Sequence, residues 1–315
     1  NEPGTHFPNL RVQTGPTMYG QDAVLRLFNF DQSLLNLDRL NIPPEQRAQI
    51  DEIVSHPRGM VLMVGPTGSG KSTTLYSMLN ALNSSEKKII TLEDPIEYGL
   101  DGISQIPINT TDGKSFADGL RSVLRLDPDV VMVGEIRDQD TARTAIQASI
   151  TGHLVLSSFH ANSTAAAFSR MIDLIGQNPI FSSAIRLLIA QRLVRRLHEE
   201  TKEEYDPDDA TKRWVQEVLA DLPESVEKPN LDSFKLWRPK PSEDAPFGYK
   251  GRVVLMEQMV VTEDIQRFLR GDEDEIHSEL IEAAAKRGGM VTLLQVGVLA
   301  ALKGETTLEE INRVV

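Results

Sequence analysis

The sequence predicts an α/β fold, in which helices cover a parallel sheet, and three observations point to it. An apolar run at residues 60–64 leads into a glycine-rich turn at 65–72, and a helix follows up to about residue 83. Two more predicted strands, 87–92 and 130–133, each run into acidic residues. Apolar strands that alternate with helices are typical of a parallel sheet buried on both faces. Acidic residues at the carboxyl ends of such strands face the crevice in which these sheets bind ligands.

Length and composition set the outer limits of this fold. The chain has 315 residues, 40% of them hydrophobic, which suits roughly two or three packed modules. No apolar run reaches the ~20 residues of a membrane span, and the sequence begins without a signal-peptide pattern, so we expect a cytoplasmic protein. The net charge of −13 argues against a broad nucleic-acid-binding surface. The absence of cysteine excludes disulfides, thiolate metal sites and thiol chemistry.

The first 42 residues contain two short predicted strands, 10–14 and 23–27, on either side of a turn rich in glycine and proline. A segment this short buries little apolar surface, so we interpret it as the end of a domain whose beginning lies outside this sequence. Arg11 and Arg26 alternate with apolar neighbours along the two strands. They are either solvated arginines on an exposed strand face or residues that contact a nucleotide.

The glycine-rich turn follows a predicted helix at 44–54 and a strand, and it has the G-x-x-x-x-G-K-S spacing of a phosphate-binding loop. Glycines let backbone N–H groups approach phosphate oxygens, and the positive end of the next helix faces the same anion. We expect Lys71 to bridge the β- and γ-phosphates and the Ser72 hydroxyl to ligate Mg²⁺. A turn that binds nothing is the alternative. The residues predicted to bind the nucleotide are Gly65, Pro66, Thr67, Gly68, Ser69, Gly70, Lys71, Ser72 and Thr73.

Two glutamates follow predicted strands beyond this loop. Glu93 comes directly after the strand at 87–92, and Glu135 lies just past the strand at 130–133, with an amphipathic helix at 113–126 between them. In phosphate-loop ATPases, an acid after a buried strand holds Mg²⁺ or polarises the attacking water. We therefore expect Glu135 to position the water and to contribute to the Mg²⁺ site. Glu93 is then the second carboxylate and a candidate base.

Two histidines flank the next predicted strand, which follows a helix at 139–150. His160 lies at the carboxyl end of this strand, on the side of the predicted crevice, so we expect it to sense the γ-phosphate. His153, at the opposite end, is a further candidate for nucleotide binding. For both residues, the alternative is a histidine whose hydrogen bonds are satisfied within the fold.

The rest of the chain contains two predicted helices, then an acidic segment, and then a strand followed by helices. Helices are predicted at 164–175 and 180–197, and the basic residues near the end of the second either form a subunit interface or favour the negative end of the helix dipole. Residues 199–248 are acidic, contain several prolines and read as an inserted module with one helix near 208–220. A strand at 249–261 follows. Helices then close the chain at 262–270, 274–287, 291–303 and 306–315.

Four segments occur in an order that resembles the secretion ATPase superfamily. The phosphate loop corresponds to the Walker A motif of this superfamily, and residues 91–98 (TLEDPIEY) correspond to its aspartate box. Residues 127–138 (DPDVVMVGEIRD) correspond to its Walker B motif, and residues 151–162 to its histidine box. The resemblance implies a RecA-like P-loop NTPase that hydrolyses ATP with Mg²⁺. It implies four parts: the end of a PAS-like N-terminal domain with a linker (1–42), the ATPase core (43–198), an acidic insert (199–248), and a strand with a helical subdomain (249–315).

Within that superfamily, residues 10–12 with Arg26, and 248–252 with Glu257, resemble the type II secretion and type IV pilus assembly branch. This implies a homo-hexameric motor at the inner face of the cell membrane, which drives a pilus or pseudopilus through an inner-membrane platform protein. It also implies that Arg11 and Arg26 contact nucleotide when domains close. Many members carry a four-cysteine zinc module after the Gln-Arg-Leu segment. Because cysteine is absent here, we predict no structural zinc.

Three other functions compete with the assembly motor. A pilus retraction motor fits the missing zinc module, although the long insert and the C-terminal sequence favour assembly. A nucleic-acid-translocating ring would need DNA or RNA as a partner, which the acidic composition disfavours. A scaffold that binds nucleotide without hydrolysing it conflicts with the presence of Lys71, Glu93 and Glu135.

Overall fold

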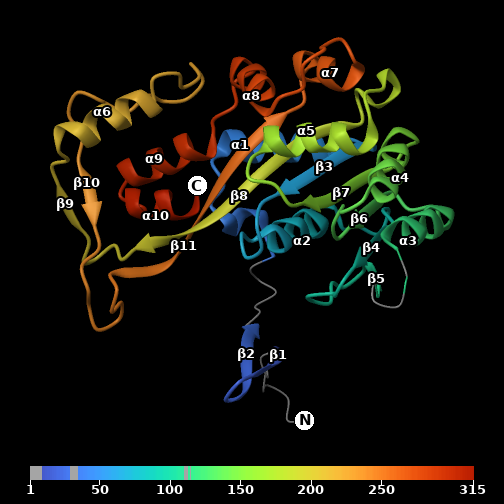
Figure 1. The fold of residues 1–315 in the computed structure, drawn as a ribbon, viewed down its shortest axis with the longest axis horizontal. Coiled ribbons are helices and arrows are strands. Elements are labelled where there is room, and N and C mark those ends of the chain that lie inside the picture. The colour runs from blue at the N-terminus through green and yellow to red at the C-terminus, as the bar shows by residue number, and fades with distance from the viewer. Residues whose placement is uncertain (1–8, 29–34, 110–112, 114) are drawn as a thin grey trace.

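The computed structural model describes residues 9–28, 35–109, 113 and 115–315. Its main sheet contains β3 (Gly59–Val64), β4 (Ile89–Glu93), β5 (Ser104–Pro107), β6 (Val130–Val133), β7 (Leu154–Phe159), β8 (Ile185–Leu197) and β11 (Tyr249–Val260). The spatial order is β11-β8-β3-β7-β6-β4-β5 (Figure 1). Every neighbouring pair is parallel except β11 and β8, which run antiparallel. The predicted α/β sheet is therefore present, with β5 as a strand that the sequence analysis did not predict.

Helices cover both faces of this sheet, which explains why its central strands have no polar face. In β3, Met60, Leu62 and Val64 pack in one apolar cluster, and Val61 and Met63 pack in another. The alternation is the two-residue period of a strand with a core on each side. The first cluster includes α3 (Phe116–Val123), α4 (Gln139–Ile150) and α5 (Thr164–Ile175). The second includes α1 (Pro44–Ser55) and α2 (Lys71–Leu82).

The sequence prediction of a helix over 180–197 is wrong, because the structure has strand β8 in this segment. β8 lies between β3 and β11 in the sheet, where it is buried along most of its length. An apolar run that is covered on both faces satisfies helical and strand spacing equally well. The pairing of β8 with two neighbouring strands decides between them, and this pairing is not visible locally. The basic residues at its end consequently do not sit at a helix C-terminus.

The N-terminal strands form a separate two-stranded sheet, which Figure 1 draws apart from the main sheet. They are β1 (Asn9–Thr17) and β2 (Gly20–Phe28), as the sequence predicted. Arg11 and Arg26 occupy directly opposite positions in the antiparallel register. Their side chains lie outside the described residues, so their predicted contact with nucleotide remains a prediction.

The segment predicted as an acidic insert contains a helix and a small sheet. Helix α6 (Asp209–Val218) confirms the helix expected near 208–220, whereas the short strands β9 (Glu203–Tyr205) and β10 (Leu236–Arg238) were not predicted. Val215, Leu219 and Leu222 form a minor apolar cluster with Val298 of the C-terminal region. Apolar packing therefore attaches this segment to the remainder of the fold.

The C-terminal helices are those that the sequence predicted, with small shifts at their ends. Residues of all four helices belong to the larger apolar cluster of the main sheet. No helix of the described ranges is long and apolar enough to cross a membrane. The helices are α7 (Glu263–Arg270), α8 (Ser278–Arg287), α9 (Leu293–Leu302) and α10 (Leu308–Val314).

Candidate functional site

The phosphate loop connects the carboxyl end of β3 to the first turn of α2. Gly68 and Gly70 have φ values of 82° and 87°, a left-handed conformation that a side chain disfavours. Gly70 is the N-cap of α2, so the loop ends where that helix offers its free N–H groups and the positive end of its dipole. The loop predicted from the glycine spacing therefore lies between a strand and a helix, as expected.

Lys71 folds back over this loop. Its Nζ donates hydrogen bonds to the carbonyl oxygens of Gly65 (2.6 Å) and Pro66 (2.9 Å). Burial lowers the pKa of Lys71, the negative charge of Glu135 raises it, and the positive charge of Arg192 lowers it further. Lys71 thus lies in the electrostatic field of the acid that the sequence assigned to catalysis.

The loop also contains polar groups that suit a bound phosphate and its Mg²⁺. The hydroxyl oxygen of Ser69 is buried and has no hydrogen-bond partner among the residues that the structure describes. A side chain at Gly65 would place its Cβ only 2.6 Å from this oxygen, so the close approach depends on glycine. Ser72, next to Lys71 on the first turn of α2, is exposed. The donor set therefore fits a nucleotide phosphate, with Ser72 free to approach a metal ion.

Glu135 and His160 meet above the ends of β6 and β7. The distance from His160 Nε2 to Glu135 Oε1 is 2.8 Å, and Arg137 Nε also contacts the Glu135 carboxylate, at 2.5 Å. Ser158 of β7 holds the segment in place, because its hydroxyl donates to the Gly134 carbonyl and its carbonyl accepts from the Ile136 N–H. Two residues that lie 25 positions apart in the printed sequence thereby form one acid–imidazole pair.

Glu93 occupies a different environment, although it also lies at a strand end. It is buried, and its carboxylate accepts hydrogen bonds from the Tyr76 hydroxyl, from Thr91 Oγ1 at 2.6 Å and from Gln105 Nε2 at 3.0 Å. Burial raises the pKa of Tyr76, and the hydrogen bond to Glu93 raises it further. Glu93 therefore anchors α2 and β5 to the end of β4.

Gln191 of β8 is a site residue that the sequence analysis missed. It is buried, its Nε2 donates to the Ser69 carbonyl at 2.8 Å, and its Oε1 accepts from Thr74 Oγ1 at 2.7 Å. A Cβ at Gly70 would lie 2.6 Å from Gln191 Nε2, so the amide is pressed against the loop. The available signal was a pair of polar residues, Gln191 and Arg192, directly after the apolar run 187–190, and the mistaken helix assignment obscured it.

His153 does not join this group within the chain. It precedes β7 at the amino edge of the sheet, where its carbonyl accepts from the Gly59 N–H, whereas the phosphate loop lies at the carboxyl edge. Its Nδ1 lies 3.0 Å from the Ala148 carbonyl at the end of α4. The predicted nucleotide contact of His153 thus gains no support from its position. His198, directly before the predicted acidic insert, is buried, with Nδ1 3.0 Å from Thr201 Oγ1.

Comparison with known proteins identifies relatives of this chain. A family model described as type II/IV secretion system protein matches residues 5–313. A type II secretion system protein E from Xanthomonas campestris is 39% identical over 314 residues, which cover 97% of this chain and 52% of the relative. A type IV pilus assembly ATPase PilB from Acinetobacter baylyi is 39% identical over 306 residues, which cover 97% and 51%. The chain thus spans about half the length of these two relatives.

A solved structure has a similar fold. The pilus retraction motor PilT with bound ADP superposes with a TM-score of 0.64 at 26% identity, over 96% of this chain and 73% of that one. The predicted RecA-like P-loop core is confirmed by this similarity together with the sheet and loop described above.

Proposed function

This chain belongs to the family of type II/IV secretion system proteins, and we propose that it hydrolyses ATP as the motor of a type IV pilus or type II pseudopilus assembly machine. The observation that carries the proposal is the meeting of three predicted residues at one edge of the sheet. Lys71 lies on the phosphate loop, and Glu135 pairs with His160 beside it. ATP hydrolysis uses a cation for the phosphates and a residue that orients the attacking water, and we assign these roles to Lys71 and Glu135, with His160 to sense the γ-phosphate.

In this mechanism the loop N–H groups and Lys71 bind the β- and γ-phosphates. Lys71 exchanges its two backbone carbonyl acceptors for phosphate oxygens, which carry more negative charge. Ser72 and Glu135 would hold Mg²⁺, which neutralises charge on the phosphates when it is bound. Glu135 orients the attacking water, and His160 senses whether the γ-phosphate is present. Glu93 serves as a second carboxylate.

We propose that the working form is a homo-hexamer that contacts an inner-membrane platform protein from the cytoplasmic side. Arg11 and Arg26 would reach the nucleotide when the N-terminal hairpin closes on the core. Mass measurement by light scattering, with and without a non-hydrolysable ATP analogue, tests the assembly. Six copies are expected with the analogue, and a monomer under all conditions argues against it.

Phosphate release by the purified chain, measured with and without DNA and RNA, tests the reaction. We expect hydrolysis that neither nucleic acid stimulates, since the net charge of −13 opposes binding of a polyanion. Stimulation by DNA or RNA would instead favour a nucleic-acid translocase. Nucleotide binding without any phosphate release would favour a scaffold.

A retraction motor is the second candidate, because the chain superposes on PilT over most of its length. The two can be separated in cells that lack either an assembly or a retraction motor. We expect a full-length protein with this chain as its ATPase portion to restore pili to the first strain. Restored retraction in the second strain would instead identify the protein as a retraction motor.

A further inference from the structure

Arg192 follows Gln191 on β8, and its guanidinium joins three segments of backbone. Nη1 donates to the Gln191 carbonyl at 3.0 Å, Nη2 to the Asn162 carbonyl at 2.8 Å, and Nε to the Val314 carbonyl at 3.0 Å. The residue is 6% exposed. All three of these acceptors are uncharged main-chain oxygens, an unusual environment for a buried cation.

The three carbonyls belong to parts of the fold with different roles. Asn162 is two residues after His160, on the segment that leaves β7 toward α5. Val314 is the last residue of α10, and Gln191 holds the phosphate loop. A Cβ at Gly65 would lie 3.2 Å from Arg192 Nη1, so the guanidinium also lies against the loop itself. One side chain therefore links the phosphate loop, the His160 segment and the C-terminal helix.

The charge of Arg192 has consequences at the site. Burial lowers the pKa of Arg192, and the negative charge of Glu257 raises it. Its positive charge also lowers the pKa of Lys71, so the two cations lie within electrostatic reach of each other. A buried guanidinium without a paired carboxylate costs more free energy than an apolar side chain of the same size. The fold retains it even so, which indicates a role beyond packing.

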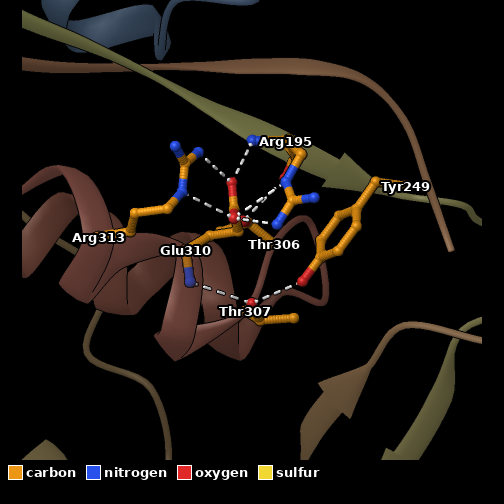
Figure 2. Close-up of polar contacts among 6 residues, drawn as sticks. All are labelled: Arg195, Tyr249, Thr306, Thr307, Glu310 and Arg313. Atoms are coloured by element: carbon orange, nitrogen blue, oxygen red, sulfur yellow. Dashed lines mark hydrogen bonds and ion pairs between the residues drawn. The ribbon is translucent and has the colours of Figure 1, made fainter. Parts of the chain in front are cut away.

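A second cluster docks α10 against β8 (Figure 2). The Glu310 carboxylate accepts from the backbone N–H of Arg195 at 2.9 Å, from Arg195 Nη2 at 2.6 Å and from Arg313 Nη2 at 2.8 Å. Burial would raise the pKa of Glu310, but hydrogen bonds from Arg195 and Arg313 lower it to about 2. Figure 2 also shows the Tyr249 hydroxyl beside Thr307 at the start of the same helix. These contacts fix the position of Val314, and with it the third acceptor of Arg192.

We propose that Arg192 is a positioning residue for ATP hydrolysis, which holds His160 at the distance from Glu135 that the reaction needs while α10 is docked on β8. This inference rests on the proposed ATPase function. The position of the C-terminal helix then controls turnover without contacting the nucleotide. Arg192 binds the Asn162 carbonyl with one nitrogen and the Val314 carbonyl with another. Movement of α10 therefore loosens the segment that contains His160.

The experiment compares Arg192→Met with Glu310→Gln, using the full chain. Methionine keeps an unbranched apolar stem and removes the guanidinium group, with its charge and its hydrogen bonds. We expect kcat to fall at least about 10-fold while the Kd for ADP stays within about 2-fold, because positioning errors act on the chemical step. Glu310→Gln, which weakens the docking of α10 on β8, should lower kcat by a similar factor. The double variant should be no slower than the slower single variant, since both remove the same constraint.

Arg213→Met, an exposed position on α6, is the matched control and should leave kcat unchanged. Circular dichroism and the melting temperature verify folding, and if Arg192→Met does not fold, Arg192→Lys takes its place with a smaller expected fall in kcat. An ADP affinity that weakens as much as kcat falls would overturn the proposal in favour of phosphate binding. Normal kcat in either Glu310→Gln or the Arg192 variant would also overturn it. Wild-type hydrolysis that is lost in Lys71→Ala establishes the ATPase function whatever these variants do.

Discussion

The ends of β4 and β6 are neighbours in the sheet, and each carries a glutamate in a different environment. At the end of β4, Glu93 is 4% exposed and accepts hydrogen bonds from Tyr76, Thr91 and Gln105, which are all uncharged donors. Just past the end of β6, Glu135 contacts His160 and Arg137, at a side-chain exposure of 13%. One carboxylate is enclosed by uncharged donors, and the other contacts an imidazole and a guanidinium group.

This difference in environment indicates different roles for the two strand-end acids. Because the partners of Glu93 are fixed by packing, a change there disturbs α2 and β5 before it disturbs bound nucleotide. The partners of Glu135 are side chains at the rim, which can rearrange when phosphate and Mg²⁺ bind. Glu135 also raises the pKa of Lys71, so it belongs electrostatically to the phosphate loop. We therefore assign the larger catalytic effect to Glu135.

The largest expected effect comes from Lys71→Ala, which removes the cation beside Glu135. Hydrolysis should fall to background, because the phosphates lose their mobile positive charge. Phosphate release and circular dichroism measured on the same sample check this result. A folded variant with wild-type turnover would remove the loop from the mechanism.

Glu135→Gln tests the β6 side of the comparison directly. The amide keeps the shape and loses the charge, so ATP binding should persist while hydrolysis falls by about 100-fold or more. Titration of ATP beside phosphate release separates the two quantities. Equal losses of binding and hydrolysis would shift the role of Glu135 toward holding Mg²⁺.

We propose that the arginines at positions 11 and 26 bring positive charge to the γ-phosphate when the N-terminal hairpin closes. Replacing either with alanine should lower kcat by at least ~10-fold and leave ADP affinity nearly unchanged, since ADP lacks the γ-phosphate. Single-turnover hydrolysis and ADP titration measure both quantities. Normal hydrolysis in both variants would identify them as solvated strand residues.

Glu93→Gln tests the β4 side and should act mainly on stability. Its amide nitrogen cannot accept a hydrogen bond, so at least one of the three buried donors loses its partner, at about 1–3 kcal/mol. Urea unfolding should show this loss, together with a fall in kcat smaller than that of Glu135→Gln. If Glu93→Gln leaves stability unchanged and lowers kcat more than Glu135→Gln does, the roles that we assign to the two acids are the wrong way round.

The smallest expected effect is that of metal removal on the melting temperature. The sequence has no cysteine to bind zinc as a thiolate, so we expect elemental analysis to find no stoichiometric zinc. A chelator should leave the melting temperature unchanged once the effect of Mg²⁺ on nucleotide binding is controlled. One zinc per chain would contradict our interpretation of residues 199–248.

The site was predictable where a local pattern determines geometry. The spacing at residues 65–72 predicted a glycine-rich phosphate loop, and the structure has one between β3 and α2, with a left-handed backbone at Gly68 and Gly70. Glu135 and His160 follow buried parallel strands, whose carboxyl ends share one edge, so their proximity follows from the fold class. The same reasoning placed Glu93 at that edge, but its three hydrogen bonds come from elements whose packing no local pattern specifies.

The sequence by itself determined the α/β class, the phosphate loop and the acid–histidine edge, because these depend on short spacings and on strands that are apolar throughout. Tertiary structure alone decided that 185–197 is a strand, since burial on both faces removes the period that distinguishes strand from helix. The placement of Gln191 and Arg192 against the loop followed from that decision. Most of their partners lie far away along the chain, and the pairing of β8 with β3 brings Gln191 against the phosphate loop.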